Sequence, residues 1–262
     1  MKQIKEITSD KNTIYKTLKT LSQKKVREAN RLFLIEGLRL FQEALSRGVG
    51  LKYLIIDEAR KEVPNTPQGC QIFRLKDHLF KKISDTVNPQ GIIAVAEKTE
   101  MFLKDIELNA MPFIVVLDRI QDPGNLGTII RTCAAAGITA LLLVNGTVDL
   151  YNPKVIRSTM GALFQVPIVE RLKDSEAIKW LQEHSIEIMV ADLDGEEYYY
   201  NIDLRKPLAI VIGNENKGLS SIWKKAARKK VKIPIPGLTE SLNASVAAGI
   251  ILYDVVRQRS CD

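Results

Sequence analysis

The C-terminal half of the chain repeats one pattern, in which short apolar runs alternate with stretches of helical periodicity. The apolar runs are the expected strands, and they lie at 113–117, 140–144, 187–191, 208–212 and 231–233. The expected helices lie at 127–136, 152–161, 175–184, 222–228 and 245–259. Strands that are apolar along nearly their whole length are typical of a parallel sheet covered by helices on both faces. The pattern therefore predicts an α/β fold for this half.

The first 97 residues predict a smaller α/β domain. Helical spacing of apolar residues runs through 12–30, 38–45 and 76–83, and short strands are expected at 33–35, 53–56 and 92–96. Alternating short strands and helices of this kind indicate one α/β layer structure. Residues 98–112 are charged, contain Asn109 and Pro112 and have no clear strand. We therefore expect domains at 1–97 and 113–262, joined by a linker at 98–112.

The charge of the chain favours a partner that carries phosphates. The formal net charge is +7, and the first fifty residues hold eleven Lys or Arg against five Asp or Glu. A basic cluster of this kind raises the local concentration of an anionic polymer, although charge alone does not identify the partner.

Several function classes are not expected from the composition. The three cysteines, Cys70, Cys133 and Cys261, are far apart, and the chain has only two histidines. Such a sparse set predicts neither a disulfide framework nor a metal site. No run approaches the roughly 20 apolar residues of a membrane span, and the first residues are polar rather than a signal peptide. We expect a cytoplasmic protein that uses no metal and no membrane.

Three polar loops follow expected strands, which is where ligands bind in open α/β sheets. The first contains Asp122-Pro-Gly-Asn125 and leads into a helix that carries Arg131. The second runs from Gly213 to Gly218 and has the sequence Gly-Asn-Glu-Asn-Lys-Gly. Neither loop fits the glycine-rich fingerprints of dinucleotide or phosphate binding. Each loop alone is equally well explained as a tight turn.

The third loop is rich in proline at 234–237 and continues through Ser241-Leu242-Asn243 into a helix of small residues. Taken alone it indicates an N-capped helix, with Ser241 or Asn243 as the capping residue. Small residues at the start of that helix allow close packing against a neighbouring segment.

In this order and spacing the three loops closely resemble the signature motifs of the SpoU/TrmH family of RNA 2′-O-ribose methyltransferases. The matching segments are 122–131, 212–218 and 233–243, and the first domain resembles the ribosomal-protein-like RNA-binding domain of the family through 33–37 and 84–91. The resemblance implies an α/β-knot fold with a mostly parallel sheet, in which the C-terminal segment threads a loop to form a trefoil. It also implies S-adenosylmethionine as cofactor and a homodimer with the cofactor pocket beside the subunit interface.

The resemblance also implies a set of catalytic residues, namely Asn125, Arg131, Glu215, Ser241 and Asn243. Arg131 matches the proposed catalytic residue of the family, but a guanidinium is effectively never deprotonated in proteins. We therefore expect Arg131 to clamp an RNA phosphate or stabilise developing charge. Glu215 either accepts a proton or braces Asn125 or Arg131, and the sequence does not choose between these roles.

By the same resemblance, Gly213, Ile233 and Leu242 hold the cofactor. Leu193 is a further candidate, for which packing in the core is the favoured interpretation. Lys24, Lys25, Arg27 and Arg31 are the expected RNA-binding side chains of the first domain, since phosphate contacts provide affinity and register. The alternative for these four residues is an ordinary solvated helix face.

The function that the resemblance implies is S-adenosylmethionine-dependent methylation of a ribose 2′-hydroxyl. Ribosomal RNA is the expected substrate, because the separate N-terminal domain resembles that of the rRNA-modifying branch of the family. A tRNA 2′-O-methyltransferase and a catalytically silent RNA-binding or ribosome-assembly factor are the alternatives. The complete set of motif residues argues against a silent factor. A nucleotide-using α/β enzyme of another family is disfavoured by the missing phosphate-binding fingerprints.

Overall fold

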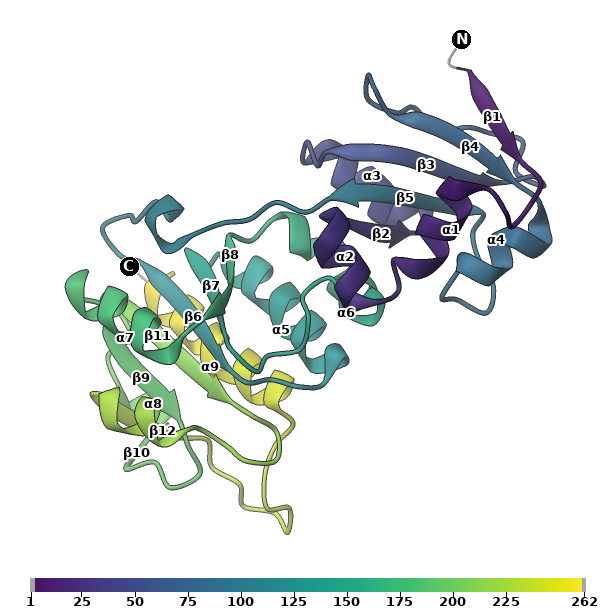
Figure 1. Cartoon of the computed structure of the whole chain (residues 1–262). Helices are drawn as coiled ribbons and strands as arrows, with labels where there is room; N and C mark the ends of the chain where they lie inside the picture. Colours follow the sequence, from purple (N-terminus) through teal and green to yellow (C-terminus); the bar gives the residue numbers. More distant parts are fainter. Residues whose placement is uncertain (1–2, 261–262) are drawn as a thin grey trace. The chain divides into compact units, whose positions relative to one another are not determined.

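The computed structural model describes residues 3–260 and divides the chain into two compact units (Figure 1). The first unit contains the chain up to Thr99 together with Tyr151–Phe164, and the second contains Glu100–Leu150 and the chain from Gln165 onward. The inserted segment holds helix α6 (Pro153–Thr159) and the short 3-10 helix η2 (Ala162–Phe164). The expected division was linear and placed this segment in the second domain, whereas the structure groups it with the first unit.

The first unit is built on a five-stranded mixed sheet with the order β1-β4-β3-β5-β2. Strand β5 pairs antiparallel with β2 and β3, while β4 pairs parallel with β1 and β3. The strands are β1 (Ile4–Ile7), β2 (Leu32–Glu36), β3 (Leu51–Asp57), β4 (Gln71–Leu75) and β5 (Ile92–Glu97). The helices before α6 are α1 (Thr13–Thr20), α2 (Lys24–Asn30), α3 (Leu38–Ser46) and α4 (Asp77–Ile83).

The helical stretch expected at 12–30 is two helices, because the chain turns between α1 and α2. The side chain of Asn12 caps α1, and the guanidinium of Arg27 donates to the carbonyl oxygens of Leu21 at 2.8 Å and Ser22 at 2.5 Å. Arg27 is only 3% exposed. A buried guanidinium needs acceptors, and backbone carbonyls at the turn supply them. Arg27 is therefore a structural residue of the turn, and we remove it from the expected RNA-binding surface.

The second unit has a seven-stranded sheet with the order β10-β12-β9-β11-β6-β7-β8. Every strand pair among the described residues of this sheet is parallel. The strands are β6 (Phe113–Asp118), β7 (Ala140–Val144), β8 (Ile168–Leu172), β9 (Glu187–Ala191), β10 (Glu197–Tyr198), β11 (Leu208–Gly213) and β12 (Lys229–Lys232). This architecture confirms the predicted α/β class with a mostly parallel sheet, while the trefoil knot stays a prediction.

Helices pack on both faces of this sheet (Figure 1). They are α5 (Pro123–Ala136), α7 (Asp174–Glu183), α8 (Ser221–Ala226) and α9 (Ala244–Arg259), with 3-10 turns η1 (Leu103–Asp105) and η3 (Tyr199–Asn201). Alternate strand residues such as Ile114 and Val116 join Trp180 of α7 and Trp223 of α8 in one core cluster. The indole N–H of Trp223 donates to the Asp174 carboxylate at 2.6 Å, so its burial leaves no polar atom unpaired.

The opposite face is covered by α5 and α9, which pack against each other. Helix α9 also contacts β11, the central strand between β6 and β9. Because the strands are parallel, the loops that follow β6, β9, β11 and β12 meet at one edge of the sheet. No helix within residues 3–260 is both long enough and apolar enough to cross a bilayer.

Candidate active site

A cavity of about 600 Å³ opens at the carboxyl ends of the parallel strands of the second unit. Its walls come from 121–125 after β6, 191–193 after β9, 212–219 after β11, 231–235 around the end of β12, and 241–247 at the start of α9. All three predicted motif loops therefore contribute to one cavity. Its volume lies within the range of small-molecule sites, which is roughly 300–1,000 Å³.

Helix α5 delivers Asn125 to this cavity. Asp122 is the N-cap, and its Oδ1 accepts the backbone N–H of Asn125 at 2.8 Å, while Pro123 takes the first helical position. Both choices favour helix initiation, because the cap satisfies a free N–H and proline has none to satisfy. The helix thus begins four residues before the expected start at Gly127, and Asn125 is 9% exposed.

Two hydrogen bonds join the three motifs in a chain. The Nδ2 of Asn125 donates to Oε1 of Glu215 at 2.9 Å, and the Nδ2 of Asn243 donates to Oδ1 of Asn125 at 2.9 Å. The first motif is therefore held between the second and the third through a single side chain.

Glu215 also accepts the backbone N–H groups of Gln121 and Asp122, both at 3.2 Å. Burial by itself would raise the pKa of this carboxyl group, but the hydrogen bonds from the Asn125 amide and these backbone groups outweigh it, and the net pKa is lowered. Glu215 is thus a carboxylate at neutral pH whose oxygens already accept three N–H donors. Of the roles left open by the sequence, these contacts favour bracing of Asn125.

The loop between β11 and α8 is organised by Asn214. Its backbone N–H and carbonyl pair with those of Gly218 at 3.1 and 2.9 Å, and its Oδ1 accepts two further backbone N–H groups. A Cβ added to Gly213 would lie 2.7 Å from the Gly218 carbonyl carbon, so no larger residue fits there. Gly218 itself has a φ of 63°, which glycine adopts without strain.

Asn243 links the third motif to helix α9. It is the N-cap, and its Oδ1 accepts from the backbone N–H of Ser245 at 2.9 Å and from the Ser245 hydroxyl at 2.6 Å. Of the two expected capping residues, Asn243 therefore has this role, whereas Ser241 is exposed and lines the cavity. The same amide that caps α9 through its oxygen holds Asn125 through its nitrogen.

Of the predicted cofactor-binding residues, Gly213, Ile233 and Leu242 all line the cavity. Leu193 lines it as well and is 61% exposed, so the expectation that it packs in the core is corrected. The cavity combines these apolar side chains with the polar groups of Asn125 and its partners. That mixture suits the adenosine and amino-acid parts of S-adenosylmethionine.

Of the five predicted catalytic residues, Arg131 does not line this cavity, whereas the other four do. It lies on the exposed side of α5, six residues beyond Asn125, and is not among the residues that line the cavity. Within residues 3–260, no hydrogen bond or ion pair is formed by its side chain.

Sequence reasoning missed Asp118, which ends β6 and is fully buried. Its carboxylate accepts the backbone N–H of Ser220 at 2.7 Å and pairs with Arg119 at 3.0 Å. It thereby ties the first motif loop to the start of α8. The available signal was a charged residue that directly follows an uninterrupted apolar strand. Among residues 3–260, no three His, Cys, Asp or Glu side chains are grouped so as to hold a metal ion.

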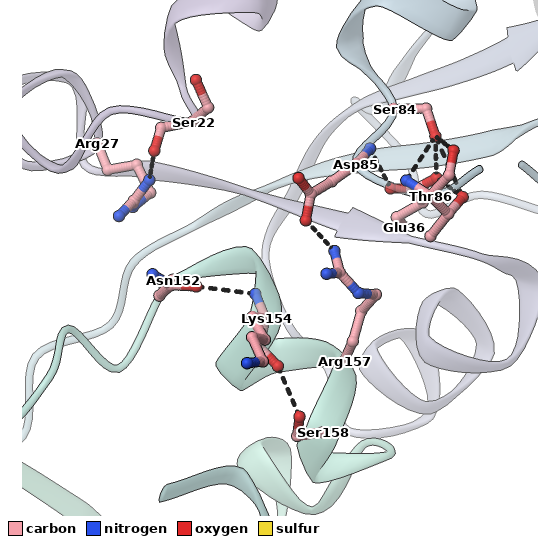
Figure 2. A network of polar contacts seen from close by, with 10 residues as sticks. All are labelled: Ser22, Arg27, Glu36, Ser84, Asp85, Thr86, Asn152, Lys154, Arg157 and Ser158. Carbon is pink, nitrogen blue, oxygen red and sulfur yellow. Dashed lines mark hydrogen bonds and ion pairs between the residues drawn. The ribbon is translucent and has the colours of Figure 1, made fainter. Parts of the chain in front are cut away.

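The first unit contains a second polar network, drawn in Figure 2. Glu36, at the end of β2, accepts the hydroxyl groups of Ser84 and of Thr86, the latter at 2.6 Å, and the backbone N–H of Asp85 at 2.9 Å. Asp85 in turn pairs with Arg157 of α6. These residues belong to the segments 33–37 and 84–91 on which the resemblance of the first domain rests.

Three of the four expected RNA-binding residues are accessible in the first unit. Lys24 and Lys25 are exposed on α2, with Lys24 paired to Glu28 at 3.9 Å, and Arg31 is exposed at the C-cap of the same helix. Arg31 adopts a left-handed φ of 54°, which places it beyond the helical path.

Comparison with known proteins decides the family. The model of the SpoU rRNA Methylase family matches residues 112–253, and that of an MRM3-like substrate binding domain matches residues 12–94. This chain belongs to the SpoU rRNA methylase family. Membership confirms the resemblance, the enzyme class and the S-adenosylmethionine cofactor that the motifs predicted, with RNA as the class of substrate.

Relatives in this family match along nearly the whole chain. A Bacillus subtilis protein named 23S rRNA (guanosine(2553)-2′-O)-methyltransferase RlmP is 35% identical, covering 95% of this chain and 98% of its own length. A Streptomyces viridochromogenes 23S rRNA (uridine(2479)-2′-O)-methyltransferase is 32% identical, covering 87% and 83%. The structure of an AdoMet-bound rRNA methyltransferase from Sinorhizobium meliloti superposes with a TM-score of 0.87 at 34% identity, covering 97% and 98%.

Proposed function

We propose that this protein methylates a ribose 2′-hydroxyl in ribosomal RNA, using S-adenosylmethionine as the methyl donor. The observation that carries the proposal is the chain of hydrogen bonds from Asn243 through Asn125 to Glu215 at the wall of the cavity. Two further findings support it. Relatives that share more than 30% of its residues are named as 23S rRNA 2′-O-methyltransferases, and its N-terminal region matches a substrate binding domain.

The cofactor supplies an electrophilic methyl group, and the protein supplies position and electrostatics. Gly213, Ile233 and Leu242 would hold the cofactor in the cavity. The amide groups of Asn125 and Asn243 each have a second N–H with which to orient the ribose, because each gives only one N–H to the network. Glu215 fixes both amides through Asn125.

We propose that a second copy of the chain completes the site. Helix α9 has no strongly polar face, and its side chains Val246 and Tyr253 remain 50% and 51% exposed. Helix α5, which carries Arg131, packs against α9. A homodimer formed through these helices would cover the apolar face. It would also bring the partner subunit's Arg131 to an RNA phosphate at the cavity, where a fixed positive charge stabilises the reacting hydroxyl.

Tritium transfer from labelled S-adenosylmethionine tests the reaction. Purified protein would be incubated separately with ribosomal RNA and transfer RNA, beside Arg131→Ala as the matched variant. We expect label in alkali-resistant dinucleotides of ribosomal RNA, with a loss of at least about 100-fold in the variant. Label only in transfer RNA would select the tRNA alternative, and cofactor binding without label in any RNA would select the silent RNA-binding factor.

Sedimentation of Tyr253→Glu tests the dimer. A charge on the α9 face should yield monomers that still bind the cofactor but no longer transfer methyl groups. A variant that stays dimeric, or monomers with full activity, would contradict the completed site.

The expected cytoplasmic location is likewise a proposal, which fractionation of cells that express a tagged chain would test.

A further inference from the structure

Three consecutive tyrosines project from the edge of the second unit. Tyr198 ends β10, and Tyr199 and Tyr200 begin the following 3-10 turn. The rings of Tyr198 and Tyr200 are stacked, with centroids 5.5 Å apart and planes 13° from parallel, and Tyr199 meets Tyr200 edge-on at 5.1 Å. Tyr198 and Tyr200 are nevertheless 39% and 46% exposed. A stacked pair of rings left open to solvent is an unusual feature for a surface that binds nothing.

Positive charge lies directly beside these rings. The Nζ of Lys232 is 5.5 Å from the centroid of Tyr198, within reach of a cation–π contact. Two of the neighbouring carboxylates are paired, since Glu197 pairs with Lys229 at 2.5 Å and Asp192 pairs with Lys224 at 2.6 Å, while Asp194 and Glu196 in the same segment are exposed. An aromatic surface with a lysine at its edge has the composition that single-stranded nucleic acid binds, because bases stack on rings and phosphates meet the cation.

The stack also lies next to the cavity along the chain and across the sheet. In β12 and the residue after it, Val231 and Ile233 line the cavity, whereas Lys232 between them alternates to the other face of the strand and does not line it. Tyr198 is the parallel partner of Lys232, and the segment 191–193 that leads toward β10 lines the cavity as well. Figure 1 shows β10 and β12 side by side at the edge of the second unit.

We propose that Tyr198, Tyr200 and Lys232 form a stacking platform for an unpaired RNA base close to the nucleotide that is methylated. This inference rests on the proposed function, because it assumes that RNA enters the cavity beside β12. A ribose held for methylation must be presented by an unpaired or splayed strand, and neighbouring bases then need a surface on which to stack. The platform would fix the strand on the catalytic unit independently of the first unit.

Binding of a fluorescein-labelled single-stranded oligouridylate of about ten nucleotides would test the platform. The variant is the double change Tyr198→Ala and Tyr200→Ala in the full chain. We expect its affinity to fall about tenfold, which matches the loss of one stacked base. The double change to Phe keeps both rings and should bind like the wild type. A duplex RNA probe should show little difference between the proteins.

The chain offers a matched control elsewhere in the same unit. Phe102 is 54% exposed, and the Nζ of Lys104 is 5.7 Å from its ring, so it has the same chemistry on a segment that does not line the cavity. Phe102→Ala should leave oligouridylate binding unchanged. An equal loss in this variant would show non-specific binding to any exposed ring, and it would overturn the proposal.

Photocrosslinking provides a second, positional readout. An oligonucleotide that contains 5-iodouridine should form crosslinks with the peptide that holds residues 198–200, since that base reacts with stacked aromatic side chains. Unchanged affinity in the Ala double variant, or crosslinks confined to other peptides, would refute the platform. A changed oligomeric state with unchanged RNA affinity would show a protein contact instead. These measurements need no methyl transfer, so their failure is distinguishable from failure of the proposed reaction.

Discussion

Two glutamates, one in each unit, each accept several hydrogen bonds from loop residues, but the networks that they form connect different parts of the molecule. Glu215 gathers two backbone N–H groups and the amide of Asn125, while Glu36 gathers one backbone N–H and two hydroxyl groups. Each carboxylate accepts hydrogen bonds from donors of a loop that would otherwise bond to water. Hydrogen bonds to a charged group are stronger than those between neutral groups.

The difference lies in what each network connects. Glu36 holds a single loop, 84–86, whose outer residue Asp85 pairs with Arg157. Glu215 belongs to a chain that runs through Asn125 to Asn243 and so spans three loops around a cavity. A network that spans several loops sets the geometry of a reaction, whereas a network confined to one loop shapes a surface. Substitution of Glu215 should therefore lower the rate of methyl transfer, whereas substitution of Glu36 should weaken RNA binding.

The largest effect is expected from Asn125→Ala, which removes the central member of the chain. Loss of one preorganised hydrogen-bonding group at a reacting centre lowers kcat by about 10²–10³-fold. Cofactor affinity should change less than about threefold, because the cavity walls remain, and calorimetry with S-adenosylmethionine would check this. If methyl transfer continued at the wild-type rate, the chain of hydrogen bonds would have no catalytic role.

Glu215→Gln should have the next largest effect. The new amide keeps one acceptor oxygen but turns an NH₂ group toward donors of the loop, and the donors that face it lose their partner. We expect kcat to fall about 10–100-fold, a smaller effect than that of Asn125→Ala because Asn125 still receives the bond from Asn243. A matching loss in Glu36→Gln would remove the contrast between the units.

Glu36→Gln should raise the concentration of RNA needed for half-maximal rate, with kcat nearly unchanged. The change loosens the hold on Ser84 and Thr86, so the loop at 84–91 loses its fixed form. An increase of about three- to tenfold is expected. This is less than the full loss of one hydrogen bond to a charged group, about 1.5–3 kcal/mol, would give, because the loop relaxes around the new side chain. Steady-state kinetics with ribosomal RNA would measure it, and Lys24→Gln would serve as a comparison on the same unit.

The smallest expected effect is a contribution of Glu215 to the pH dependence of stability. Its pKa is lowered in the folded chain, so the ionised form is favoured by folding. This contribution is fully present above the ordinary glutamate pKa of about 4.3 and is lost as the pH falls through the lower folded value. Urea unfolding of wild type and Glu215→Gln should therefore differ at pH 7 and converge in acid. A gap that widens in acid would contradict the sign.

The central strands and the motif loops of the second unit were predictable from the sequence. Their signal is local: β7 is apolar throughout, β9 is apolar after its first residue, Glu187, and both are predicted with their observed bounds. Strands β8 and β10 were missed, because β8 contains charged residues and β10 is only two residues long. Neither has the pattern by which a buried strand is recognised.

Relations between distant residues could not be predicted in the same way. The Asp-Pro pair at 122–123 indicates a turn that leads into a helix, but not that the helix begins as early as Pro123. The hydrogen bonds of Asn125 depend on where two other loops end. Arg27 was expected at an RNA surface because charge is usually exposed. Its burial depends on the turn after α1, where backbone carbonyls are available to the guanidinium. The grouping of 151–164 with the first unit likewise depends on tertiary packing.

The most direct test compares Glu215→Gln and Glu36→Gln in single-turnover methyl transfer with ribosomal RNA. At saturating RNA, the account predicts that Glu215→Gln remains slow while Glu36→Gln reaches the wild-type rate. At low RNA concentrations, Glu36→Gln should be slow as well. If saturating RNA restored the rate of Glu215→Gln, or failed to restore that of Glu36→Gln, the assignment of one network to the reaction and the other to binding would be contradicted.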